Sequence, residues 1–152
     1  PQVSLVTSVL NGGGIVGCLF FPLVADHWGR KIALTIYFLG AAIAVPVTFF
    51  FVQEYFLAVL VSPLVGFFGA GVFTGFAIYL PELFPTVIRA TAQGFCYNFA
   101  RIFSAAAPFV AGAMVSAHGS FARAITAVGL VYLLALVVLI FARETKGQAL
   151  PE

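Results

Sequence analysis

Long apolar stretches separated by short polar connectors run through the whole chain. A helix needs about 20 apolar residues to cross a bilayer, and five stretches reach that length. The period-two alternation that a barrel strand requires is absent from them. Backbone groups in lipid must bond within their own segment, so each stretch is predicted to be a helix. The predicted spans cover residues 3–25, 32–52, 56–80, 92–117 and 122–142.

Composition supports the same class. The chain is 62% hydrophobic and only 8% charged, with a mean hydropathy of +1.13. Soluble domains carry roughly a quarter charged residues. We therefore predict an all-α integral membrane protein whose solvent is the lipid bilayer. The net charge of +2 is too small to indicate a nucleic-acid partner. Cys18 and Cys96 lie in apolar spans and are expected to be buried, inert thiols.

The basic residues predict an orientation, because cytoplasmic loops of membrane proteins are enriched in lysine and arginine. With five spans, the first connector, the third connector and the tail fall on one side, and they hold nearly all of the basic residues. The opposite side holds only Arg123. Loops 26–31 and 81–91 and the C-terminus are therefore expected to be cytoplasmic, in a plasma or inner membrane.

The first connector, "ADHWGRK", has the composition of a tight turn between two membrane helices. Gly29 supplies a residue free in φ. Asp26 ends the preceding helix, where an anion is unfavourable unless it is paired. Arg30 and Lys31 lie close enough to pair with it or with a neighbour. The alternative is a basic stop signal that serves only membrane topology.

Two further segments place charges at the same membrane face. "PELFPTVIRAT" separates Glu82 from Arg89 by six residues across a turn that contains proline. A pair between them would hold one helix end against another, and partial desolvation would strengthen it. The alternative is a solvated loop. In "FARETKGQALPE", Glu144 follows the last span directly.

Taken together, these three motifs resemble the major facilitator superfamily, in particular its sugar-porter-like and metabolite–proton symporter branches. "ADHWGRK" is similar to the signature loop D-R-x-G-R-R/K, "ELFPTVIR" to the E-x6-R loop before the eleventh helix, and "RETKG" to the P-E-T-K-G after the twelfth. The resemblance implies that residues 1–152 are helices 8–12 of a twelve-helix fold: a C-terminal six-helix half that lacks its first helix. The chain begins at Pro1 and is expected to be a piece whose partner is the missing N-terminal half.

The resemblance also implies a role for the charges. They would form a cytoplasmic gating network that holds one state and breaks as the two halves of the transporter rock. This sequence differs from the family motifs at three positions: it has Pro22 in place of a glycine, His27 in place of an arginine and Arg143 in place of a proline. The first two put the tightness of the contact between helix and loop in doubt. The expected network comprises Asp26, Gly29, Arg30, Lys31, Glu82, Arg89 and Glu144.

One charge lies deep in an apolar run. Arg101 is about nine residues into the fourth span, or roughly 14 Å at ~1.5 Å per residue, in a hydrocarbon core about 30 Å thick. It shares one helix face with Asn98, and Tyr97 and Gln93 form the neighbouring strip. Lipid would not tolerate that side, so it is expected to face the bundle interior or water.

Two interpretations of Arg101 remain open. In one it binds an anionic substrate, with Asn98, Tyr97 and Gln93 donating hydrogen bonds, because a guanidinium meets a carboxylate with two parallel bonds. In the other it pairs with a carboxylate in the missing half, or lies at a shallower depth. Some carboxylate symporters carry a similar arginine upstream of a proline in this helix, which favours an organic anion over a sugar.

Glycine spacing predicts how helices pack. Gly13 and Gly17 lie four residues apart, as do Gly71 and Gly75, which is typical of small-x-x-x-small contacts. The second set resembles a dinucleotide loop, but the spacing is wrong and no strand precedes it, so no cofactor is expected. Asn11, beside three glycines, is a hypothetical marker of a bent helix near a cavity.

The function predicted from all of this is secondary active transport of a small metabolite by alternating access, with an organic anion as substrate and proton coupling. The alternative substrate is a sugar or another neutral solute. No acidic residue lies inside a predicted span, so a proton carrier is expected in the missing half. An enzyme is not expected, because the sequence motifs of metallo- and serine hydrolases are absent, and no metal site is expected. A non-transporting scaffold or sensor on the same fold is the alternative of another class.

Overall fold

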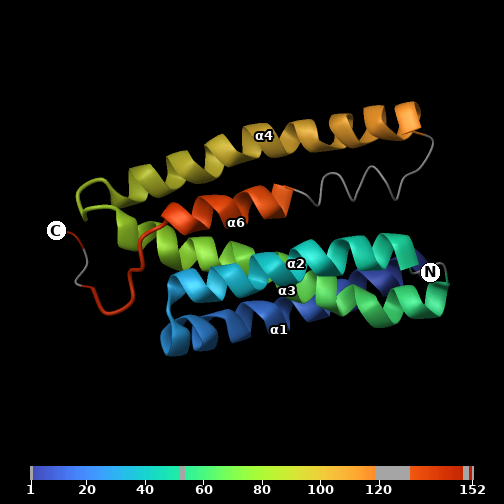
Figure 1. Cartoon of the computed structure of the whole chain (residues 1–152), viewed down its shortest axis with the longest axis horizontal. Coiled ribbons are helices and arrows are strands. Elements are labelled where there is room, and N and C mark those ends of the chain that lie inside the picture. The colour runs from blue at the N-terminus through green and yellow to red at the C-terminus, as the bar shows by residue number, and fades with distance from the viewer. Residues whose placement is uncertain (1, 52–53, 119–130, 149–150, 152) are drawn as a thin grey trace.

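The computed structural model of the chain describes residues 2–51, 54–118, 131–148 and 151, and all regular structure among them is helical. The helices are α1 (Gln2–Trp28), α2 (Arg30–Phe51), α3 (Tyr55–Leu83), α4 (Arg89–His118) and α6 (Val131–Phe141). Figure 1 shows them as long rods running along one axis. The predicted all-α class is confirmed.

The first four helices contain the predicted spans and extend past most of their ends. Residue 52 of the second span and residues 122–130 of the fifth lie outside the described residues, and α6 forms the remainder of the fifth. By length and composition, α1, α2 and α3 qualify as membrane-crossing helices. Helix α4 has the length, with 30 residues, but Gln93, Asn98 and Arg101 make it less apolar. Its span therefore stays a prediction.

Glycines bring α1 and α3 into backbone contact. A methyl group added at Gly13 or Gly17 would overlap the backbone of Pro63 or Phe67 on α3. In the reverse direction, a methyl group at Gly66 would overlap the carbonyl of Leu10. Close approach of this kind is how membrane helices gain van der Waals contact without a hydrophobic driving force. The predicted packing role of Gly13 and Gly17 is confirmed.

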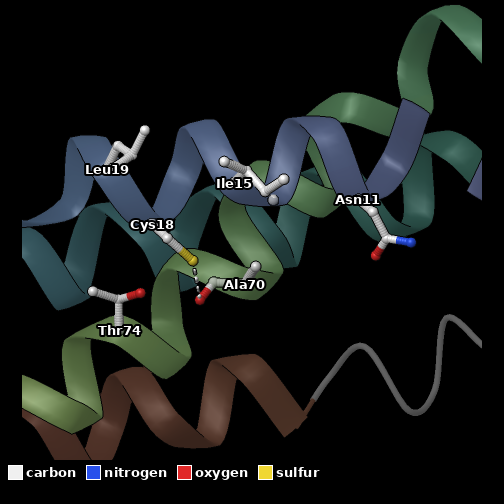
Figure 2. A pocket seen from close by; sticks show the side chains of 7 residues that line it. Asn11, Ile15, Cys18, Leu19, Ala70 and Thr74 are labelled. Carbon is white, nitrogen blue, oxygen red and sulfur yellow. Dashed lines mark hydrogen bonds between the residues drawn. The ribbon is translucent and has the colours of Figure 1, made fainter. Parts of the chain in front are cut away.

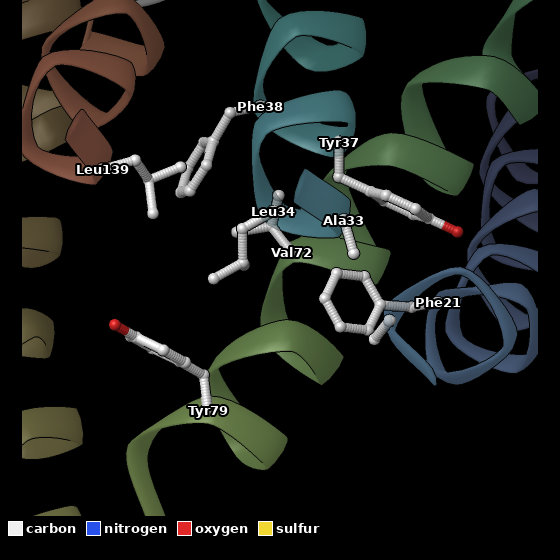
Figure 3. Close-up of a cluster of buried hydrophobic side chains, with 9 residues drawn as sticks. Phe21, Ala33, Leu34, Tyr37, Phe38, Val72, Tyr79 and Leu139 are labelled. Atoms are coloured by element: carbon white, nitrogen blue, oxygen red, sulfur yellow. The ribbon is translucent and has the colours of Figure 1, made fainter. Parts of the chain in front are cut away.

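The other glycine pair makes room for aromatic rings. Gly71 faces the ring of Tyr37, and Gly75 faces Leu34 and Phe21. Figure 3 shows these side chains inside a cluster that joins α1, α2, α3 and α6. The hydroxyl of Tyr37 donates a 3.0 Å hydrogen bond to the carbonyl of Gly17, which satisfies the one polar atom of this buried ring. The cluster fixes how the helices line up along their length.

Helix α4 stands apart from this core. Among the described helices it comes close only to α3, and Figure 1 shows it at the edge of the bundle. The α1–α2 turn, the α3–α4 loop and the tail after α6 gather at one end of the molecule (Figure 1). Hydrogen bonds between these segments, described below, hold that end together.

Candidate functional site: a charge cluster and a groove

The turn between α1 and α2 depends on Gly29 for two reasons. Its φ is +105°, a region that residues with a side chain rarely adopt. A Cβ there would also lie 2.6 Å from the carboxylate Oε2 of Glu144. The predicted need for a free φ is confirmed, and the structure adds that the tail carboxylate occupies the space of the missing side chain.

Glu144 caps the N-terminus of α2. Its Oε1 accepts from the backbone N–H of Arg30 at 2.9 Å, and its Oε2 accepts from that of Lys31 at 3.1 Å. The N–H groups of Thr145 and Lys146 add two bonds of 3.0 Å each. The first N–H groups of a helix have no partner within it and favour an anion. Glu144 therefore joins the predicted network as a helix cap.

The backbone N–H groups around Glu144 determine how readily its carboxylate is protonated. Burial acts to raise its pKa, but the N–H groups of Lys146, Arg30, Lys31 and Thr145 together hold the pKa below its usual value. Because the pKa of Glu144 is lower in the folded protein than its unfolded value of about 4.3, the charged carboxylate stabilises the fold at pH values above about 4.3. This stability is lost as the pH falls through the folded pKa.

We expect Glu144→Gln to lower the melting temperature of the purified protein at neutral pH, because an amide replaces a charge-assisted acceptor. The difference from the wild-type protein should shrink as the pH falls from about 4.3, the unfolded pKa, through the lower folded pKa, where the wild-type carboxylate is protonated as well. Glu54→Gln, at an exposed carboxylate that makes no side-chain capping bond, controls for the loss of charge alone. A difference that is the same at every pH contradicts the capping role.

Arg30 links α2 to α1 and α3. Its Nη2 lies 3.1 Å from Oε1 of Glu82 on α3, and its Nη1 lies 3.0 Å from Oδ1 of Asp26 on α1. The side chains of Arg30 and Glu82 are each 18% exposed, whereas that of Asp26 is 72% exposed. Exposed pairs contribute little, so the pair with Glu82 is the stronger contact. The hydroxyl of Thr145 also donates to Glu82, which ties the tail to the same carboxylate.

Two lysines satisfy carbonyls at helix C-termini. Nζ of Lys31 donates to the carbonyl of Ile140 at 2.8 Å, in the last turn of α6. Nζ of Lys146 donates to the carbonyl of His27 at 2.6 Å, in the last turn of α1. Cations favour this end of a helix. The departure at His27 does not loosen the turn, because the contact uses its backbone carbonyl.

The predicted pair between Glu82 and Arg89 is wrong. Nε of Arg89 donates to the carbonyls of Pro81 at 2.9 Å and Phe84 at 3.2 Å, while Glu82 bonds to Arg30. The physical reason is Pro85. A helical carbonyl normally accepts from the N–H four residues on, and proline has none, so the carbonyl of Pro81 needs another donor. Nη2 of Arg89 also donates to the carbonyl of Pro151 at 3.2 Å, which joins this loop to the tail.

The predicted binding strip on α4 lies away from the cluster. Arg101 is exposed, and within the described part of the chain no side chain or carbonyl bonds to it. Asn98 donates to the carbonyl of Gly94 at 2.8 Å, and the hydroxyl of Tyr97 donates to the carbonyl of Phe73 on α3 at 3.4 Å. Gln93 is half-buried. Their role in binding stays a prediction.

A groove lies between α1 and α3 (Figure 2), and Asn11, which the sequence suggested as a marker of a nearby cavity, is one of the residues that line it. Its volume is about 440 Å³. Cys18 points into it, half-buried, and its thiol donates weakly to the carbonyl of Ala70 at 3.5 Å. Both cysteines are free and half-buried among the described residues, so they are less enclosed than the expected buried thiols. The main lining residues are Asn11, Ile15, Cys18, Leu19, Ala70 and Thr74.

Comparison with known proteins identifies the fold family. The sequence model described as "Major Facilitator Superfamily" matches residues 1–152. A metabolite transport protein of Haemophilus influenzae is 33% identical over 147 residues, which is 96% of this chain and 36% of that protein. The inner membrane metabolite transport protein YdjE of Escherichia coli is 31% identical over 97% of this chain and 33% of its own length.

A third relative carries a more specific name. The niacin/nicotinamide transporter NiaP of Bacillus subtilis is 34% identical over 125 residues, which is 80% of this chain and 30% of that protein. The chain thus spans about a third of the length of the curated relatives it matches. These relatives are named as transporters of small molecules and not as enzymes.

Proposed function

Since the chain belongs to the major facilitator superfamily and is an integral membrane protein, we propose that it forms part of a secondary transporter for a small organic anion. The remainder of the transporter, including an N-terminal half, would supply the other wall of the pathway. Transport would proceed by alternating access around a site near the bilayer midplane. We also propose that uptake is coupled to protons, with the proton carrier outside the spans of this chain.

The proposal that the substrate is an anion rests on Arg101. A guanidinium stays protonated at every physiological pH, and in hydrocarbon it needs a counter-ion or water. The described residues supply neither a carboxylate nor a carbonyl to it. A substrate carboxylate would meet the planar fork with two parallel bonds. The Bacillus subtilis relative is named for both niacin, a pyridine carboxylic acid, and nicotinamide, its neutral amide, so its name does not choose between the two substrate classes.

The charge cluster supports the gating part of the proposal. Arg30, Glu82 and Glu144 join three segments at one end of the bundle, so a movement of any one segment breaks specific bonds. We infer that these bonds form in one conformational state of the transporter and break in another, as a conformational switch requires. The bias of basic residues toward this end supports the proposal that it lies on the cytoplasmic side of a plasma or inner membrane.

A paired uptake assay tests the proposed substrate class. Vesicles that contain the full-length transporter are offered aromatic and aliphatic monocarboxylates, each matched with its own amide, as nicotinate with nicotinamide. We expect at least one carboxylate to accumulate about tenfold above its amide, and an inward proton gradient to increase that accumulation. Equal uptake of both members of every pair, or uptake of a sugar alone, contradicts the proposal.

A further inference from the structure

Tyr79 on α3 is a buried residue that joins the packed core to the tail after α6. Its side chain is 6% exposed and belongs to the hydrophobic cluster that links α1, α2, α3 and α6. Figure 3 shows the ring at one edge of this cluster, with its hydroxyl turned away from Leu34 and Phe21. That hydroxyl donates a 2.7 Å hydrogen bond to the carbonyl of Arg143.

The carbonyl of Arg143 lies beyond the end of a helix. Helix α6 ends at Phe141, and among the described residues no backbone N–H group donates to this carbonyl. A carbonyl shielded from water needs a donor, and the hydroxyl of Tyr79 supplies it. Because the bond uses a backbone atom, a change of the Arg143 side chain leaves it in place.

The peptide group that Tyr79 holds leads directly to Glu144. A peptide group is planar, so a hydrogen bond to the Arg143 carbonyl also limits the direction in which residue 144 begins. The carboxylate of Glu144 must point at the N–H groups of Arg30 and Lys31, which it meets at 2.9 and 3.1 Å. The bond from Tyr79 therefore favours the backbone orientation that this contact requires.

Glu82 holds the tail from the same face of α3. It follows Tyr79 by three residues, which places the two side chains on one side of the helix. Glu82 accepts from the hydroxyl of Thr145, and Tyr79 donates to the carbonyl of Arg143. The two contacts lie on either side of Glu144 along the chain, so the end of α3 and this part of the tail are held together.

From this geometry we propose that Tyr79 is a positioning residue of the charge cluster: its hydroxyl holds the Arg143 carbonyl so that Glu144 reaches the N-terminus of α2. Tyr79 acts through Glu144 and does not contact the transported molecule. A shift of α3 against the tail breaks the bond and releases Glu144 from α2, which couples the movement of α3 to the α1–α2 turn. The inference rests on the proposed gating function and adds an uncharged residue to it.

Melting temperatures test the positioning role without requiring transport. In the purified full-length transporter, Tyr79→Phe removes the hydroxyl and keeps the ring. Glu144→Gln should lower the melting temperature by less in Tyr79→Phe protein than in wild-type protein, because residues that act in one network are not additive. In Tyr79→Phe protein the stability given by the Glu144 charge should also be lost at a higher pH, closer to about 4.3, because fewer N–H groups then lower its pKa.

Tyr37→Phe is the matched control for the loss of a buried hydroxyl. Tyr37 is 1% exposed, belongs to the same cluster and donates a 3.0 Å bond to a backbone carbonyl, that of Gly17. Tyr37→Phe should lower the melting temperature by a similar amount, yet leave both the effect of Glu144→Gln and the pH profile unchanged. The proposal is overturned by equal results for the two tyrosine variants, or by full additivity of Tyr79→Phe with Glu144→Gln.

Uptake separates this role from the gating function on which it rests. Tyr79→Phe should reduce carboxylate uptake about fivefold, the size expected for one buried hydrogen bond, with the preference for carboxylate over amide unchanged. In the Glu144→Gln background the same substitution should change uptake less than about twofold. Tyr37→Phe should stay within about twofold of the wild-type rate. If Tyr79→Phe weakens the effect of Glu144→Gln on melting but leaves uptake unchanged, the gating function fails and the positioning of Glu144 stands.

Discussion

Replacing Arg101 by glutamine is expected to reduce carboxylate uptake by about 100-fold, the effect of truncating one partner of a desolvated, hydrogen-bonded charge pair. Glutamine keeps a polar group of similar length but loses both the charge and the planar fork. Arg101→Lys should retain part of the activity, because lysine keeps the charge and binds as a single point. Uptake is measured in vesicles and normalised to the amount of transporter in the membrane.

Arg143→Gln provides a matched control for this result. Arg143 is an exposed arginine after α6, and among the described residues its one hydrogen bond is made through its carbonyl, which accepts from the Tyr79 hydroxyl at 2.7 Å. Uptake by the Arg143→Gln variant should stay within about twofold of that by the wild-type protein, because surface substitutions usually have small effects. Arg101→Gln that inserts normally and transports carboxylates at the wild-type rate would refute the anion contact.

Glu82→Gln is expected to reduce transport about tenfold without changing the amount of protein in the membrane. Among the described residues, the substitution leaves the half-buried guanidinium of Arg30 with one ion-pair partner, the exposed Asp26, beside the carbonyl of Ala25. It also weakens the acceptor of the Thr145 hydroxyl, so the tail loses part of its hold on α3. Because a latch of this kind stabilises one conformational state, its loss should shift the balance between states more than it unfolds the protein.

The two carboxylates that pair with Arg30 are expected to differ in their effect on transport. Asp26→Asn should have a smaller effect than Glu82→Gln, because its side chain is 72% exposed and its pair with Arg30 is weak. Uptake rates of the two variants, measured side by side, decide the ranking. An equal loss in both variants would mean that net charge at this end matters and that the geometry around Arg30 does not.

Sequence patterns predicted the features that depend on local chemistry. Helix positions follow from the apolar runs, the turn at Gly29 from its place between two helices, and the α1–α3 contact from glycine spacing. Each of these depends on a residue and its near neighbours. The association of Glu82 and Glu144 with one cluster was predicted from motifs, but their individual bonds were not.

The hydrogen bonds that the sequence did not predict depend on which backbone N–H and carbonyl groups lack a partner within their own helix. Arg89 reaches the carbonyl of Pro81 because Pro85 cannot donate to it, and Glu144 reaches the N–H groups of α2 because the turn at Gly29 leaves room. A charge count suggests pairing among side chains and overlooks these backbone groups. For the groove, the sequence indicated only Asn11, because the lining residues on α3 join it only once the glycine contacts set how α1 and α3 align.

The most direct test of the central claim is the ratio of two affinities in purified transporter. Binding of a transported carboxylate and of its amide is measured by titration calorimetry for the wild-type protein and for Arg101→Gln. We expect the wild-type protein to bind the carboxylate at least about tenfold more tightly than the amide, a difference of about 1.4 kcal/mol, and the variant to bind both equally. A variant that keeps the wild-type preference would show that the carboxylate is held elsewhere.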